Sequence, residues 1–152
     1  MTQTSLPLEQ RIDRLAEVAV RVGLGLREGQ ELVMTAPLDA LPLVRRITEH
    51  AYKAGASLVT TLLSDEEMTL ARFRHAPDSA FDTAPGWLFE GMGKAFAGNA
   101  ARLAITGEDP NLLSAEDPEK VSRANRARSR AYLPALERIV NFDINWTIAS
   151  FA

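Results

Sequence analysis

Two acidic groups in the sequence lie where they could do chemistry, each directly after a short apolar segment. Asp65 and Glu66 follow the first such segment, and Glu108 and Asp109 follow the second. Carboxylates near the ends of parallel strands could bind a divalent cation or the amino group of a substrate. These four residues are therefore the candidates for substrate binding.

Both groups also have a purely structural explanation. Ser64 can accept a hydrogen bond from the backbone N–H of Glu67 while the Glu67 side chain reaches back, which makes a capping box at a helix start. Acidic residues also suit the positive end of a helix. Glu108 and Asp109 belong to the sequence GEDPN, whose residues favour a turn. Because these explanations are sufficient by themselves, the substrate-binding role is a hypothesis.

Other kinds of site have little support in the sequence. His50 and His75 lie in different predicted elements, and neither belongs to a cluster with metal-ligand spacing. The chain has no cysteine, which excludes disulfides and thiolate chemistry. It has no G-x-S-x-G elbow. The apolar segment over 31–36 runs into Pro37 and not into a glycine-rich phosphate loop. We therefore expect neither a catalytic residue nor a metal site within this chain.

One segment is rich in positive charge. Lys120, Arg123, Arg126 and Arg130 recur three or four residues apart and would share a helix face, with Arg128 on a different face. A basic face could meet an acidic partner or nucleic acid. However, no aromatic residues are interleaved with these charges, and the whole chain has a net charge of −3. A solvated face or a surface of intramolecular ion pairs is favoured, and we expect no nucleic-acid binding.

The elements that would position these residues centre on a strand–helix–strand pattern. A strand over 31–36, closed by Pro37, is followed by a helical pattern that ends at Gly55 and by a second strand over 57–63. The helix is too long for a hairpin, so the pattern predicts a parallel βαβ unit with a right-handed crossover. The apolar residues of this helix are Leu41, Val44, Ile47 and Ala51.

An amphipathic helix precedes this unit. Its apolar residues fall at helical spacing. Gly23 and Gly25 should close the helix, because glycine accepts the left-handed conformation found at many helix ends. The predicted apolar face consists of Leu8, Ile12, Leu15, Ala19 and Val22.

The second half of the chain alternates helices and strands. Asp117 as a cap and Pro118 in the first turn make a strong helix start, and Pro134 should interrupt that helix. The aromatic residues of a helix over 85–97 should cover an edge of the sheet. The expected elements are helices over 65–74, 85–97 and 117–130, a short helix ending at 138, and strands over 101–105 and 144–151.

These elements predict a single α/β domain over residues 1–152. It should have three α/β/α layers and a mainly parallel open sheet of at least four strands in a flavodoxin-like arrangement. The length of 152 residues fits one core, and the 46% hydrophobic and 24% charged residues are ordinary for a soluble globular protein. The first residues, MTQTSLPLEQ, do not form a signal peptide, and no apolar run could span a membrane. We expect a cytoplasmic protein that does not bind membranes.

Three blocks of the sequence, taken in order, carry a family resemblance. The first block, from Val22 to Pro77, includes the segments REGQ, KAGA and SDEE. The second is ITGEDPNLLSAEDPEKV, from Ile105 to Val121, and the third is the terminal NFDINWTIASFA. Their joint order extends through nearly the whole chain. It resembles the N-terminal domain of a longer two-domain enzyme, in the thermophilic-type dinuclear metallo-aminopeptidase family (the aminopeptidase T and aminopeptidase S type).

The resemblance implies an activity for the parent protein. Enzymes of that family remove N-terminal residues from peptides with a pair of divalent metal ions, zinc or cobalt among them, and are homodimers. Their metal ligands, a set of Glu, His, Asp and Tyr residues, lie in a C-terminal half, and no position of this chain matches them. The resemblance thus implies a non-catalytic domain that is inactive alone and binds no metal. Its partners would be the C-terminal catalytic domain of the same polypeptide, peptide substrates and a second copy.

A different class of function stays open at this stage. The chain could be a stand-alone flavodoxin-like module for ligand binding, signalling or oligomerisation. A signalling module would need a phosphoacceptor aspartate at a strand end, and Asp65 is the only plausible one. Its place in the predicted capping box argues against that use.

Overall fold

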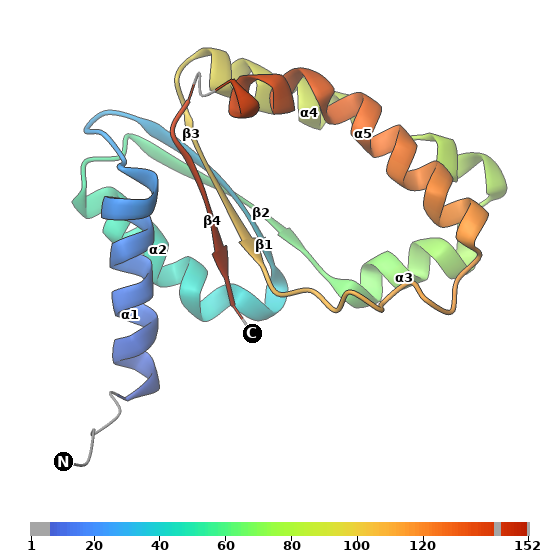
Figure 1. Cartoon of the computed structure of the whole chain (residues 1–152), viewed down its shortest axis with the longest axis horizontal. Coiled ribbons are helices and arrows are strands. Elements are labelled where there is room, and N and C mark those ends of the chain that lie inside the picture. Colours follow the sequence, from blue (N-terminus) through green and yellow to red (C-terminus); the bar gives the residue numbers. More distant parts are fainter. Residues whose placement is uncertain (1–6, 142–143, 152) are drawn as a thin grey trace.

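A four-stranded parallel sheet lies between two layers of helices (Figure 1). The structure is a computed structural model and describes residues 7–141 and 144–151. The strands are ordered β2-β1-β3-β4, which is the order of the first four strands of a flavodoxin-like sheet. Their bounds are β1 (Glu31–Pro37), β2 (Leu58–Ser64), β3 (Ala101–Thr106) and β4 (Trp146–Ser150). The predicted α/β class and parallel sheet of at least four strands are confirmed.

The central βαβ unit follows its sequence pattern. β1 ends at Pro37, and a 3₁₀ turn, η2 (Leu38–Ala40), leads into α2 (Leu41–Lys53). β2 then pairs with β1 in parallel over its whole length, from Glu31 opposite Leu58 to Pro37 opposite Ser64. The predicted parallel βαβ unit is confirmed, because local periodicity specifies both strands and the helix.

One face of the sheet is buried along its length by the first two helices. These are α1 (Leu8–Val18), which continues as the π-helical segment η1 (Ala19–Leu24), and α2. Leu32 and Met34 of β1 and Leu103 of β3 have no exposed surface. They join residues of all three helical segments in the main core.

The buried side of α1 differs from the predicted apolar face. Ile12 and Ala19 do contact the core, but Leu8, Leu15 and Val22 are exposed. Small side chains such as Ala16 let α1 lie close to α2. After residue 18 the helix becomes π-helical, so a 3.6-residue period no longer gives the facing of Val22. The left-handed Gly25, with φ of 61°, ends the helix as predicted, whereas Gly23 lies within the π-helical segment.

The second helix layer is formed by α4 (Gly86–Ala97) and α5 (Pro118–Val140). Phe89, Met92 and Phe96 of α4 form a core with Val33 of β1 and Ala135 of α5. The prediction that these aromatics cover an edge of the sheet holds only in part. α4 packs over the face at the inner strand β1, and Leu62 of the edge strand β2 contacts the same core.

Helix α5 is continuous, so the predicted interruption at Pro134 is wrong. Asp117 caps it as expected, accepting a hydrogen bond from the backbone N–H of Glu119 at 2.9 Å. Pro134 removes a hydrogen bond to the carbonyl of Arg130, but both residues are exposed, so water can solvate that carbonyl. The buried Ala135 and Ile139 keep the following turns packed against α4.

A third, smaller core joins α5 to the segment after β2. It contains Phe73 of α3 (Glu66–His75), Phe81 of the 3₁₀ segment η3 (Asp78–Asp82), and Ala124 of α5. The Phe73 and Phe81 rings lie 5.3 Å apart. No helix in the described part of the chain is long and apolar enough to cross a membrane.

The turn at Gly55 provides a stability test. Gly55 has φ of 99°, and a Cβ there would lie 2.8 Å from Cγ and 3.0 Å from Cα of Glu28. We expect Gly55→Ala to lower the free energy of unfolding by roughly 2 kcal/mol, measured by urea denaturation, because backbone strain and contact with Glu28 add. Gly93→Ala is the matched control, because it lies in α4 with open space around it and should stabilise by up to about 1 kcal/mol. Equal urea midpoints for both variants would contradict this reading of the turn.

Candidate functional site

The carboxyl ends of β1, β2 and β3 border a cleft of about 600 Å³. Its walls come from the end of β1, the start of α3 and the loop after β3, and Figure 1 shows α3 starting where β2 ends. A second cavity of about 200 Å³ shares Pro37 and Ser64 with it and extends to Asp39. All four predicted substrate-binding candidates line the cleft: Asp65, Glu66, Glu108 and Asp109.

The position of this cleft follows from the topology. The helix after β1, α2, covers one face of the sheet, whereas the helix after β3, α5, belongs to the layer on the other face. Neighbouring strands whose connections leave toward opposite faces open a crevice at their carboxyl ends. The cleft is the crevice between β1 and β3.

Asp65 is the N-cap of α3. Its backbone is extended, and its Oδ2 accepts a hydrogen bond from the backbone N–H of Met68 at 3.2 Å. The predicted capping box with Ser64 as the cap is therefore wrong. Ser64 still belongs to β2, and its hydroxyl donates to the carbonyl of Ala36 at 3.5 Å. The helix begins one residue later than that box required.

A direct hydrogen bond links the two acidic groups. Oε1 of Glu66 accepts from the backbone N–H of Asp109 at 2.8 Å, and Oδ1 of Asp109 accepts from the backbone N–H of Asn111 at 2.9 Å. The structure thus brings together two loops that are 43 residues apart in sequence. Three of the four candidate carboxylates are engaged in ordering backbone, and Glu108 is exposed.

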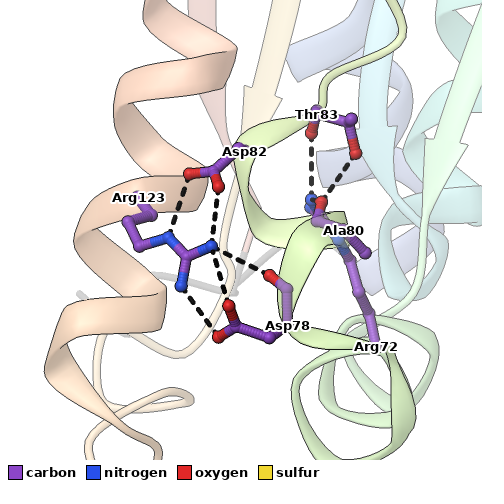
Figure 2. Close-up of polar contacts among 6 residues, drawn as sticks. All are labelled: Arg72, Asp78, Ala80, Asp82, Thr83 and Arg123. Atoms are coloured by element: carbon purple, nitrogen blue, oxygen red, sulfur yellow. Dashed lines mark hydrogen bonds and ion pairs between the residues drawn. The ribbon is translucent and has the colours of Figure 1, made fainter.

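Two arginines also line the cleft and limit its negative charge. Arg72 of α3 turns toward η3, where its Nη2 donates to the carbonyls of Ala80 at 3.0 Å and Thr83 at 3.1 Å (Figure 2). Arg128 of α5 is exposed. The arrangement offers several carboxylate oxygens to a small cation or an ammonium group, with no nucleophile paired with a base.

Arg123 of α5 binds two aspartates of η3 at the same time. Its Nε donates to Asp82 Oδ1 and its Nη1 to Asp78 Oδ1, both at 2.9 Å (Figure 2). Its Nη2 donates to Asp82 Oδ2 at 2.6 Å and to the backbone carbonyl of Asp78 at 2.9 Å. Hydrogen bonds from Arg123 hold the pKa of both aspartates below the ordinary value of 3.8, and the aspartates raise the pKa of the guanidinium.

This contact changes the reading of the basic helix face. Arg123 is largely buried by its partners, and the ammonium of Lys120 lies 5.3 Å from the centre of the Phe81 ring. Two of the four regularly spaced cations are thus used within the molecule. For Arg123, the interpretation of the face as a surface of intramolecular ion pairs is confirmed.

The two histidines have separate environments. His75 ends α3 and is exposed. His50 of α2 is buried, and its Nε2 lies 2.9 Å from Asp13 Oδ1 of α1. The hydrogen bond from His50 is the main reason why the pKa of Asp13 is lowered. This pair ties α1 to α2.

Sequence reasoning missed a group of possible metal ligands around His50. Asp13, Glu17 and His50 offer ligand atoms that all lie within 4.8 Å of one another, and among the described residues no other such group is found. Asp13 and His50 are 37 residues apart, so their sequence positions carried no sign of proximity. The four-residue spacing of Asp13 and Glu17, on one face of α1, was the available signal.

Comparison with known proteins identifies the family of this chain. The family model for thermophilic metalloproteases (M29) matches residues 8–152. The chain belongs to this family. The resemblance stated from the sequence blocks is thereby confirmed.

The relatives are longer proteins. Aminopeptidase T of Thermus thermophilus is 50% identical over 95% of the chain, and aminopeptidase 2 of Geobacillus stearothermophilus is 39% identical over 93%. A solved structure, wild-type AmpT from Thermus thermophilus, matches 96% of the chain with a TM-score of 0.92 and 49% identity. The chain spans about 35% of the length of these curated relatives and 37% of the solved chain.

The Arg123 contact predicts an acid-dependent loss of stability. Because both aspartates have lowered pKa values in the folded chain, their contribution is complete above the unfolded value of about 3.8 and is lost as the pH falls through the folded values. Arg123→Gln should reduce the stability at pH 7, and its free energy of unfolding should then fall less steeply between about pH 5 and pH 3 than that of the unsubstituted chain. Urea denaturation across this pH range measures both effects.

Arg138→Gln is the control for that experiment. Arg138 is also an arginine of α5 and is exposed near the other end of the helix. This variant should keep the acid dependence of the unsubstituted chain. An unchanged acid dependence in Arg123→Gln as well would show that the two aspartates are not held by Arg123 in solution.

Proposed function

We propose that this chain is the N-terminal, non-catalytic domain of a metal-dependent aminopeptidase, which hydrolyses N-terminal residues from peptides. The supporting observation is the 50% identity with aminopeptidase T of Thermus thermophilus over 95% of this chain but only 35% of that protein. In this proposal residues 1–152 form one domain, joined to a C-terminal catalytic domain of the same polypeptide. The whole enzyme is a cytoplasmic homodimer.

The family implies a metal cofactor, and we propose a pair of zinc or cobalt ions in the parent enzyme. Such ions polarise the scissile carbonyl and lower the pKa of a bound water. The described residues do not fit such a pair. The Asp13–Glu17–His50 group supplies only three side chains, fewer than two ions require, and its Asp13 and His50 already bind each other. This supports our proposal that the metal ligands belong to the C-terminal domain.

The strand-end cleft would contribute to substrate access. Asp65, Glu66, Glu108 and Asp109 place carboxylate oxygens at one edge of the sheet. A peptide substrate carries an ammonium group at the end that an aminopeptidase recognises, and carboxylates attract it. We propose that this edge guides the peptide toward the catalytic domain.

The flavodoxin-like strand order also suits a second candidate, a stand-alone ligand-binding, signalling or oligomerisation module. In a signalling module Asp65 would accept a phosphoryl group. The hydrogen bond from Met68 and the N-cap position already occupy this carboxylate, which disfavours that use.

The 152-residue chain should be inactive. Assayed with zinc or cobalt on a chromogenic aminoacyl substrate, it should show no aminopeptidase activity, and calorimetric titration should show no stoichiometric tight metal binding. The matched variant is His50→Gln, which removes the imidazole ligand of the Asp13–Glu17–His50 group. Tight binding that disappears in this variant would place a metal site in this domain and contradict the prediction.

The proposed role of the cleft is tested in the longer polypeptide. Glu108→Gln removes an exposed negative charge at the cleft and should raise KM for a peptide a few-fold at low salt, leaving kcat unchanged, because only encounter is weakened. Glu90→Gln, at an exposed position of α4, is the control and should change neither constant. An unchanged KM in Glu108→Gln would remove this residue from substrate access.

A further inference from the structure

The two faces of the sheet differ sharply in how well they are covered. On the face toward α1 and α2, Leu32, Met34, Leu103 and Ile105 are at most 3% exposed. On the other face one row of register partners crosses all four strands near their carboxyl ends. This row, here called the open row, consists of Leu62, Thr35, Ala104 and Ile148, none of which is buried.

The helices of the second layer reach the open row only at its β2 end, where Leu62 packs against the core beneath α4. The buried members of that core include Val33, Ala100 and Ile144, which lie nearer the amino ends of the strands, and neither Ala104 nor Ile148 belongs to it. α5 packs mainly on α4 and η3, and Figure 1 shows it running beside the sheet toward α3 without lying across the strands. Ile148 is consequently 61% exposed.

A row that is only partly covered, with Ile148 exposed, is unusual for this kind of sheet. Parallel sheets occur almost only with both faces covered, because their inner strands carry apolar side chains on both sides. Exposure of a large aliphatic side chain such as Ile148 also leaves much of the favourable free energy of apolar burial unrealised. The row therefore has the character of a contact surface.

Arg102 places a positive charge beside the open row, and this charge has no carboxylate partner among the described residues. It lies on β3, one register row from the open row, and is half-buried. Its guanidinium donates to Thr35 Oγ1 at 2.7 Å and to the carbonyl of Leu103, whereas its Nε is buried without an acceptor. In the described ranges 7–141 and 144–151, no carboxylate forms an ion pair with Arg102.

We propose that the open row and Arg102 form the docking surface for the part of the polypeptide that this family carries beyond the present chain. The occupant is an apolar segment of that part, which covers Leu62, Ala104 and Ile148 and brings a carboxylate to Arg102. One observation selects it over a foreign partner. The relatives continue for about two thirds of their length outside the matched region, so a further segment of the same polypeptide can cover this surface. The proposal rests on the proposed function, in which a second domain exists.

The absence of cysteine makes this surface accessible to a labelling experiment. Ile148→Cys places one thiol on the open row. We expect a maleimide to modify it about tenfold more slowly in the longer polypeptide than in the 152-residue chain, because the docked segment must open first. Val22→Cys is the matched control: Val22 is 77% exposed on the α1 side and should react at the same rate in both proteins.

The carboxylate is tested in the same background. Adding Arg102→Met should raise the labelling rate of Ile148→Cys about threefold or more in the longer polypeptide, because one partner of a buried charged pair is lost. It should leave the rate in the 152-residue chain unchanged. An unchanged rate in the longer polypeptide would overturn the role of Arg102.

Equal labelling of Ile148→Cys in both proteins would overturn the docking surface. Protection that appears in the 152-residue chain and grows with concentration would also overturn it, because a second copy would then be the occupant. The aminopeptidase activity of the longer polypeptide is measured separately. Activity without protection rejects the docking surface alone, whereas protection without activity rejects the proposed function alone.

Discussion

The requirement that a parallel sheet be covered on both faces organises this structure. The face toward α1 and α2 meets it with a continuous core in which Leu32, Met34 and Leu103 are completely buried. On the other face α4 packs over Val33 of β1, and Leu62 of β2 contacts the same core, whereas Ile148 of β4 is 61% exposed. The two faces of the sheet therefore differ in how completely helices cover them, and the less covered face is the one we propose as a docking surface.

The long helix α5 does not lie across the strands of the sheet over its whole length. Its anchors are α4 at one end and η3 at the other, and the latter contact combines the Phe73–Phe81–Ala124 core with Arg123 bound to Asp78 and Asp82. A guanidinium that binds two carboxylates fixes both distance and orientation. α5 is thereby held away from the carboxyl halves of the strands, and the cleft beside Glu66 and the open row remain accessible.

The strand-end residues show how a predicted site can be located correctly and still have a different role. Asp65, Glu66, Glu108 and Asp109 do meet at one cleft, because parallel strands place their carboxyl ends together. Yet Asp65 caps α3 and Glu66 holds the loop at Asp109. The capping box at Ser64 failed because β2 extends one residue further than its apolar pattern, and only strand pairing with Pro37 decides that limit.

The sequence by itself determined the features whose pattern is local: the βαβ unit, the cap at Asp117, and the turns at Gly25 and Gly55. It also indicated the family, through the order of three sequence blocks. Tertiary structure decided what depends on distant residues. The exposure of Val22 follows from a π-helical turn, the survival of α5 through Pro134 from packing on α4, and the Asp13–His50 pair from the approach of two helices. The exposure of the open row also could not be predicted from the sequence of any single strand, because burial depends on what packs above the row. The sequence shows which side chains are apolar and how they are spaced, but only the folded chain shows whether another element covers them.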